Sequence, residues 1–240
     1  MPPAVRFRAA VSLLGRFPAL AGVDLDVAVG EVVLVHGPNG AGKSTLLRAC
    51  AGLVPVTAGE AEVLGHDLTR DRRAVRRRVG LLGHATFLYD DLTVADNVRF
   101  AVRAAGGASG GTTAAGGADA ADVAGALARL ELDGRLRDVT VARLSAGQRR
   151  RVSVAALVAR RPEVWLLDEP HAGLDAEGRD ILDILITAAV ADGAAVLVAS
   201  HELERANAIA HRAVIMAGGQ IHPAPGASTP AQPREPAGVS

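Results

Sequence analysis

The feature that most constrains this chain is a glycine-rich loop placed between an apolar run and a segment of helical character. The run EVVLVH is followed directly by GPNGAGKST at residues 37–45, which opens the segment STLLRACAGL. Gly37, Gly42, Lys43 and Ser44 fit the spacing G-x-x-x-x-G-K-[ST] in the strand, loop and helix context that this motif requires. Backbone N–H groups of such a loop converge on a phosphate at a helix N-terminus, so the chain is predicted to bind phosphate.

The loop residues have separate expected tasks. Lys43 supplies a compact cation, and the Ser44 hydroxyl is a ligand for Mg²⁺. A glycine turn with only a structural role is the alternative interpretation, and a second motif is needed to decide between the two. The residues predicted to hold the phosphates are Gly37, Pro38, Asn39, Gly40, Ala41, Gly42, Lys43, Ser44 and Thr45.

Two adjacent carboxylates supply that second motif. The apolar run VWLLD ends in Asp168, and Glu169 follows it. Ligands of α/β proteins bind at the carboxyl ends of the strands. Asp168 is therefore expected in the Mg²⁺ shell, and Glu169 is expected to polarise a water that attacks a γ-phosphate. Acids that merely open a solvated loop are the alternative, which a phosphate loop in the same chain disfavours.

The apolar runs also predict the fold class. Those at residues 31–36, 164–168 and 194–200 are almost continuously apolar, which is typical of strands covered on both faces. Between the last two runs, residues 177–190 carry an apolar stripe at helical spacing. We therefore expect an α/β fold.

Two biased tracts suggest how the chain is organised. Residues 104–122 are rich in glycine and alanine and are predicted to form a flexible loop, and residues 222–240 are rich in proline and alanine and are predicted to be a disordered tail. The region from about 85 to 160 is expected to be a helical subdomain inserted in a single domain over residues 1–221.

Composition limits the classes of partner. Lys plus Arg and Asp plus Glu both count 26, so nothing at the level of the whole chain favours nucleic acid. The single cysteine, Cys50, lies in LLRACAGL and is expected to be a buried structural thiol, which fits a reducing cytoplasm. No segment approaches the roughly 18 to 20 apolar residues of a membrane span, and the N-terminus lacks the apolar stretch of an export signal. Another polypeptide would have to supply any membrane spans.

A third motif, LSAGQ, precedes the helical segment RRRVSVAALVAR. Ser145 and Gln148 fit S-x-x-Q, a capping box that starts a helix. A capped N-terminus with Gly147 and a serine hydroxyl is also a second phosphate-binding end. One nucleotide site in one chain does not need it, but two chains that meet would use it.

These motifs, together with AGLD and His201 after VLVAS, occur in the order and spacing of the ATP-binding cassette ATPases, which the chain resembles over about residues 5–221. The resemblance implies a P-loop NTPase core with an antiparallel β subdomain and an inserted helical subdomain. It also implies binding of ATP and Mg²⁺, ATP hydrolysis, a head-to-tail dimer with a second copy of the chain, and a multi-span membrane permease as partner. The protein would then lie at the cytoplasmic face of the cell membrane.

The resemblance assigns further roles. It places Ser145 and Gly147, with Gln148 beside them, at the γ-phosphate held by the opposite chain. Asp175 in AGLD would couple the two sites, and His201 would hold the attacking water and Glu169 in place.

The chain departs from the family at two positions. His84 stands where the family usually has a glutamine that contacts Mg²⁺ and the water and reports to the membrane partner, and an imidazole there would be sensitive to pH. The aromatic that stacks on adenine aligns near Leu14, and Phe17 is the nearest ring. Stacking by Phe17 and simple core packing both remain open.

Three functional readings follow from the resemblance. With His84 and with Ala146 in LSAGQ, the chain resembles the haem-exporter ATPases of cytochrome c maturation, although Ala85 stands where those proteins typically have glutamine. A general exporter ATPase is the second reading. A soluble cassette protein acting on ribosomes or DNA is the third, disfavoured because such proteins carry two cassettes or long insertions.

Overall fold

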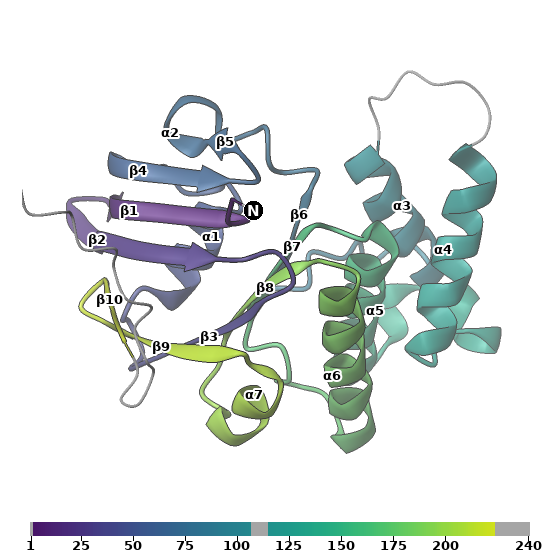
Figure 1. The fold of residues 1–240 in the computed structure, drawn as a ribbon. Helices are drawn as coiled ribbons and strands as arrows, with labels where there is room; N and C mark the ends of the chain where they lie inside the picture. Colours follow the sequence, from purple (N-terminus) through teal and green to yellow (C-terminus); the bar gives the residue numbers. More distant parts are fainter. Residues whose placement is uncertain (1, 107–114, 224–240) are drawn as a thin grey trace, which may run out of the picture.

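The computed structural model describes residues 2–106 and 115–223, with the side chains of 115–121 and 223 outside that description. Its larger sheet has six strands in the order β10-β9-β3-β8-β7-β6 (Figure 1). All neighbours are parallel except β10, which pairs antiparallel with β9. The strands are β3 (Val32–His36), β6 (Val79–Leu82), β7 (Val164–Asp168), β8 (Ala195–Ala199), β9 (Arg212–Ala217) and β10 (Gln220–Pro223).

The three apolar runs of the sequence form the centre of this sheet. They are β3, β8 and β7, which lie side by side, and their residues are buried except at the carboxyl ends of β3 and β7. Burial on both faces is what continuous runs of Val and Leu predict. The expected α/β class is confirmed.

A second sheet of four strands, in the order β2-β1-β4-β5, is antiparallel throughout. Helix α1 (Lys43–Cys50) contacts strands of both sheets. Cys50 at its end is fully buried, and burial raises the pKa of its thiol to about 12, as expected for a structural cysteine. The strands are β1 (Val5–Leu14), β2 (Phe17–Val27), β4 (Ala58–Val63) and β5 (His66–Asp67), and the short helix α2 (Leu68–Asp71) follows β5.

Helices inserted between β6 and β7 gather on one side of the molecule (Figure 1). Helices α3 (Val94–Gly106) and α4 (Ala115–Arg129) both pack against α5 (Ala146–Arg160). Two short 3₁₀ helices, Gly134–Asp138 and Val141–Arg143, lie between α4 and α5 in the sequence. Two more helices, α6 (Ala176–Ala191) and α7 (Leu203–Ile209), follow β7 and β8. Within the described residues, no helix is both long enough and apolar enough to span a membrane.

The two biased tracts are more ordered at their edges than predicted. Residues 104–106 end α3 and residues 115–122 lie in α4, so the predicted loop over 104–122 is wrong at both ends, and 107–114 lie outside the described residues. Alanine is the strongest helix former, and the prediction gave too little weight to it. The tail was likewise predicted to begin too early, because His222 pairs with Ile215 inside β10, while 224–240 lie outside the description.

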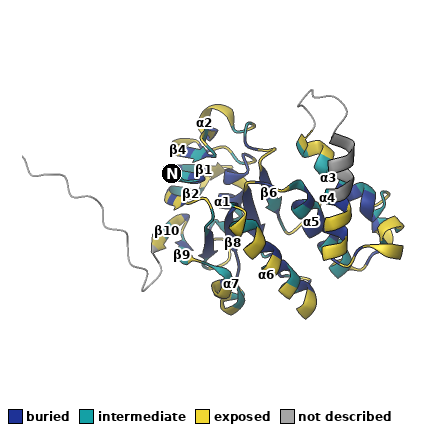
Figure 2. Ribbon diagram, turned by 45° about the vertical axis from the view of Figure 1, so that its right-hand side comes forward, coloured by how far each residue is buried: buried dark blue, intermediate teal, exposed yellow. Residues whose placement is uncertain are grey.

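The large sheet separates two apolar cores. Figure 2 colours its central strands as buried. Leu46 of α1 and Leu166 of β7 belong to the core between the two sheets. Leu167, the next residue of β7, belongs to the core beneath α5 and α6, together with Leu182 and Ile186. Successive side chains of a strand point to opposite faces, so one short strand anchors both cores.

Candidate functional site

The glycine-rich loop joins the carboxyl end of β3 to the N-terminus of α1. Gly37 has φ +147°, and a Cβ there would lie 2.0 Å from the carbonyl oxygen of Met216. Gly42 has φ +107°, and a Cβ there would lie 2.4 Å from the carbonyl oxygen of Ala19. Only glycine satisfies both the conformation and the space at these two positions.

The loop is held from inside and outside. Inside, the Lys43 ammonium donates to the carbonyl oxygens of Gly37 (2.7 Å) and Pro38 (3.0 Å). Outside, the turn between β9 and β10 touches the loop, because the Gly219 N–H donates to the carbonyl oxygen of Ala41 at 3.0 Å. The loop therefore presents a fixed backbone at the start of α1, with Ser44 and Thr45 in its first turn.

Three neighbouring strands bring the predicted acids and His201 to the same edge of the sheet. β8 lies between β3 and β7, and all three are parallel, so their carboxyl ends meet. β3 leads into the phosphate loop, β7 ends at Asp168, and β8 leads into Ser200 and His201. This edge is where α/β sheets bind ligands.

The Glu169 carboxylate forms a close pair with His201. Its Oε2 lies 2.8 Å from Nδ1 of His201 and also accepts from the His201 backbone N–H and the Ser200 hydroxyl, both at 3.3 Å. The carboxylate raises the pKa of His201 above its ordinary value of 6.5, first through the hydrogen bond and then through the opposite charge. The His201 side chain is 71% exposed, so the pair faces outward rather than into the core.

The backbone of Glu169 has the left-handed conformation, with φ +47°. Its N–H donates to the carbonyl oxygen of Ala199 at 2.8 Å, and its own carbonyl oxygen accepts from the Ala172 N–H at 3.2 Å. A residue with a side chain rarely adopts this conformation unless its surroundings hold it there.

Arg150 is a site residue that the sequence reading missed. It is 5% exposed on α5 and donates to the carbonyl oxygens of Gly83 (2.6 Å) and Glu169 (2.8 Å). Burial lowers the pKa of its guanidinium. The signal was available, because residues 150, 154 and 157 share one buried face of α5 and only one arginine of the run RRR lies on that face.

The predicted capping box at the start of α5 is confirmed. The Ser145 side chain accepts from the Gln148 N–H at 3.2 Å, and the Gln148 side chain accepts from the Ser145 N–H at 3.0 Å. No hydrogen bond joins Ser145, Gly147 or Gln148 to the phosphate loop within the described part of the chain. This helix N-terminus is exposed to solvent at Ser145.

Asp175 caps the other helix that borders this region. Its side chain accepts from the Gly178 N–H at 2.9 Å and from the Arg151 guanidinium at 2.9 and 3.1 Å. The hydrogen bond from Arg151 is the main reason that the pKa of Asp175 lies below its usual range. Arg151 also pairs with Glu131, so the AGLD segment is tied to the inserted helices.

The two positions that depart from the family pattern are both exposed. His84 lies in the loop after β6, next to Gly83, which Arg150 contacts. Phe17 is 80% exposed at the start of β2, so the core-packing alternative for this ring is wrong. Ala19, two residues later, is the residue whose carbonyl oxygen borders Gly42, which places the start of β2 beside the phosphate loop.

The residues at the sheet edge fit a magnesium nucleotide. A helix N-terminus preceded by a narrow glycine loop suits phosphate oxygens, and the Gly40 Cα faces open space at φ +79°. Mg²⁺ takes hard oxygen ligands when substrate phosphates complete its shell, and the Ser44 hydroxyl and the Asp168 carboxylate would supply oxygens of this kind.

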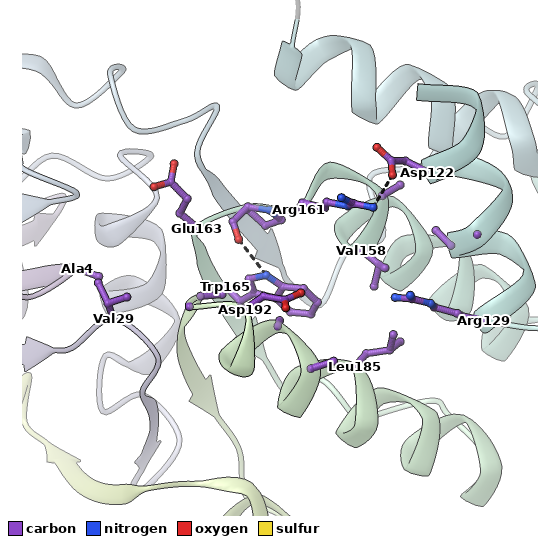
Figure 3. Close-up of a pocket in the computed structure, with 18 of the residues that line it drawn as sticks. Ala4, Val29, Asp122, Arg129, Val158, Arg161, Glu163, Trp165, Leu185 and Asp192 are labelled. Atoms are coloured by element: carbon purple, nitrogen blue, oxygen red, sulfur yellow. Dashed lines mark hydrogen bonds and ion pairs between the residues drawn. The ribbon is translucent and has the colours of Figure 1, made fainter. Parts of the chain in front are cut away.

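A cavity of about 660 Å³ lies elsewhere (Figure 3). Trp165 lines it and donates from Nε1 to the carbonyl oxygen of Pro162 at 3.1 Å, while Arg161 pairs with Asp122 at 2.6 Å on another wall. Trp165 is the second residue of β7, so this cavity lies at the opposite end of the strand from Asp168. None of the predicted site residues lines it.

Comparison with known proteins shows which family the chain belongs to. A family model described as ABC transporter matches residues 20–172. The cytochrome c biogenesis ATP-binding export protein CcmA of Paraburkholderia xenovorans (strain LB400) is 36% identical over 188 residues, covering 75% of this chain and 82% of that protein. The daunorubicin resistance ATP-binding protein DrrA3 of Streptomyces coeruleorubidus is 39% identical over 203 residues, covering 85% of this chain and 62% of that protein.

A solved structure shares the arrangement. It is described as a dimeric post-hydrolysis state of the ATP-binding cassette MJ0796 bound to ADP and Pi, and it matches with a TM-score of 0.78 at 25% identity, covering 90% of this chain and 96% of that chain. The expected ABC ATPase fold is thereby confirmed. The chain belongs to the ABC transporter family, as an ATP-binding subunit that hydrolyses ATP.

Proposed function

We propose that the chain drives a membrane exporter from the cytoplasmic face of the cell membrane, as a dimer bound to a multi-span permease. The observation that carries the catalytic part is the pairing of Glu169 with His201, 2.8 Å apart at the sheet edge that also holds the phosphate loop. We assign general-base chemistry to Glu169 and a positioning task to His201.

The hydrogen bonds of Glu169 fit that assignment. All three donors converge on Oε2, and Oε1 has no hydrogen-bond partner among the described residues. One oxygen is therefore fixed, while the other is free to accept a proton from a water that attacks the γ-phosphate. His201 donates from Nδ1 to the carboxylate, and when the ring is protonated its second nitrogen is also a donor that can bond a phosphate oxygen.

Bound Mg²⁺ supplies charge neutralisation at the phosphates. Its proposed protein ligands are Ser44 and Asp168, and His84 is proposed to contact the ion and the attacking water from the loop after β6. Lys43 and the backbone of residues 37–45 bind the β- and γ-phosphates, and Phe17 stacks on the adenine from the adjacent start of β2.

The dimer follows from a site that one chain leaves incomplete. Ser145, Gly147 and Gln148 form a capped helix N-terminus that is exposed at Ser145 and has no hydrogen bond to the phosphate loop among the described residues. Such an end favours an anion. We propose that it binds the γ-phosphate held by a second copy, as the dimeric state of the neighbouring solved structure suggests.

For the cargo we propose haem, exported for cytochrome c maturation. Support comes from the cytochrome c biogenesis proteins among the relatives, at 36 to 40% identity. The 39% identity to a daunorubicin resistance protein favours a drug exporter as the second candidate.

Two experiments test these proposals. Affinity purification from detergent-solubilised membranes is expected to recover a multi-span membrane protein, and recovery of ribosomes or DNA instead would overturn the exporter assignment. Deleting the gene is expected to abolish holocytochrome c while the apoprotein is still made. Normal covalent haem attachment in the deletion strain would reject haem as cargo and leave the ATPase assignment intact.

A further inference from the structure

His171 is a buried histidine that the phosphate chemistry above does not use. It lies in the turn after β7, two residues beyond Glu169, and its side chain is 1% exposed. Its Nε2 lies 2.7 Å from Oδ1 of Asp183 on α6. Its Nδ1 is buried and has no hydrogen-bond partner among the described residues. A proton on Nδ1 would be an unpaired buried donor, so Nε2 carries the proton and donates to Asp183.

The contact continues to the helix that follows His201. Asp183 accepts through Oδ2 from Arg205 on α7, and Arg205 also bonds Asp180 at 2.9 Å. Helix α7 begins at Leu203, whose N–H donates to the carbonyl oxygen of His201 at 3.0 Å. A chain of side-chain contacts thus runs from the turn after Glu169, across α6, to the helix that starts behind His201.

These side-chain contacts connect the segment that follows Glu169 to the segment that follows His201. Glu169 is at φ +47°, a conformation that must be held by its neighbours, and its position sets where the carboxylate meets His201. Arg150 fixes the carbonyl oxygen of Glu169 on one side. The turn that follows is closed by two backbone hydrogen bonds of 3.2 Å, from the Ala172 N–H to the carbonyl oxygen of Glu169 and from the Leu174 N–H to that of His171.

We propose that His171 is a positioning residue for hydrolysis. It acts through Asp183 and Arg205 to keep the Glu169 carboxylate within hydrogen-bonding distance of the His201 ring. The inference rests on the proposed role of Glu169 as general base. His171 itself touches neither the nucleotide nor the water, so its loss changes the rate of the chemical step and leaves nucleotide binding alone.

A second link between the same elements is weaker. Arg179 of α6 donates to the carbonyl oxygen of Leu174 at 3.1 Å and pairs with Glu202 at 3.4 Å. Its side chain is 36% exposed, so solvent competes with both contacts. In the first link the contact between His171 and Asp183 is the most protected from water, because the His171 side chain is buried, whereas Arg205 is partly exposed.

The test compares two replacements of His171 in the full chain. His171→Phe keeps a ring and removes the donor, and we expect kcat for ATP per nucleotide-binding site to fall about tenfold, while the Kd for ATP stays within about twofold. His171→Gln restores an N–H donor at nearly the same distance, and kcat should return to within about threefold of the unmodified chain. Asp183→Ala removes the same contact from the side of the more exposed residue. If His171→Phe does not fold, this variant tests the contact instead, and the same fall in kcat is expected.

Two controls separate the possible causes. Arg78→Gln breaks the exposed ion pair between Arg78 and Glu163, away from the phosphate edge, and should leave kcat unchanged. An unchanged kcat in His171→Phe, equal losses in His171→Gln and His171→Phe, or an equal loss in Arg78→Gln would each overturn the inference. Glu169→Gln is assayed alongside, because a normal rate in that variant rejects the role of Glu169, whereas a slow Glu169→Gln with a normal His171→Phe rejects only the positioning role.

Discussion

Arg150, buried on α5, donates a hydrogen bond of 2.8 Å to the carbonyl oxygen of Glu169. The same guanidinium donates to Gly83, at the end of β6 and one residue before His84. One side chain therefore joins the helix that carries Ser145 to the acid and to the loop that carries His84. A shift of α5 would therefore move both Glu169 and the loop that carries His84.

We predict that Arg150→Met lowers the free energy of unfolding by about 2 to 3 kcal/mol, because hydrogen bonds from a buried charged group to two partly buried carbonyl oxygens are lost. ATP turnover should fall with it. Chemical denaturation and a steady-state ATPase assay measure the two effects. Arg149→Gln is the matched control, since the neighbouring Arg149 makes an exposed ion pair with Asp90 worth at most about 1 kcal/mol, together with longer hydrogen bonds to the carbonyl oxygens of Ala142 (3.1 Å) and Leu144 (3.4 Å).

Glu169→Gln should reduce ATP turnover by at least about a hundredfold, the scale on which loss of a general base acts. ATP binding should survive, because Lys43 and the loop backbone are untouched, and the dimer should become trapped with nucleotide. Equilibrium binding, size-exclusion chromatography with ATP and steady-state hydrolysis together test this. A variant that hydrolyses ATP at the normal rate would remove Glu169 from the role.

Ser145→Arg should abolish hydrolysis without weakening the binding of ATP to a single chain, because Ser145 is proposed to serve the opposite chain. Mixing it with a Lys43→Ala chain should restore at most one intact site per dimer. The specific activity of the unmodified chain should also rise with protein concentration. Full activity of the isolated monomer, independent of concentration, would contradict the shared site.

The pairing with Glu169 should be visible in the titration of His201. The folded-state pKa of His201 is raised above the ordinary 6.5, so the stabilisation from the pair is fully present below about 6.5, provided that Glu169 is ionised, and is lost as pH rises through the raised value. NMR titration of the His201 ring should give a midpoint above 6.5 in the unmodified chain. Glu169→Gln should bring it back towards 6.5, and an unchanged midpoint would mean that the carboxylate does not set it.

Much of the site was predictable because its signals are local. The spacing of residues 37–44 predicts a phosphate loop, and Ser145 and Gln148, three residues apart, predict a capping box within one helical turn. The apolar runs before Asp168 and His201 predict parallel strands, and parallel strands place their carboxyl ends together.

What the sequence reading missed depends on contacts between distant elements. Nothing near His171 identifies Asp183 as its partner, because that contact exists only once α6 packs against the turn that follows β7. Arg150 looks like one member of a solvated run of arginines until the buried face of α5 is known. The exposed position of Phe17 likewise depends on how β2 runs past the phosphate loop.

Strand β9 and the turn that joins it to β10 carry no recognisable motif, yet together they form the outer wall of the phosphate loop. The carbonyl oxygen of Met216 fills the space beside Gly37, and the Gly219 N–H bonds Ala41. A shortened chain that ends before residue 212 would retain every motif from Gly37 to His201. It would nevertheless lose the contacts of Met216 and Gly219 that support the phosphate loop from outside. Motif inventory alone is thus a poor guide to the smallest working fragment of this protein.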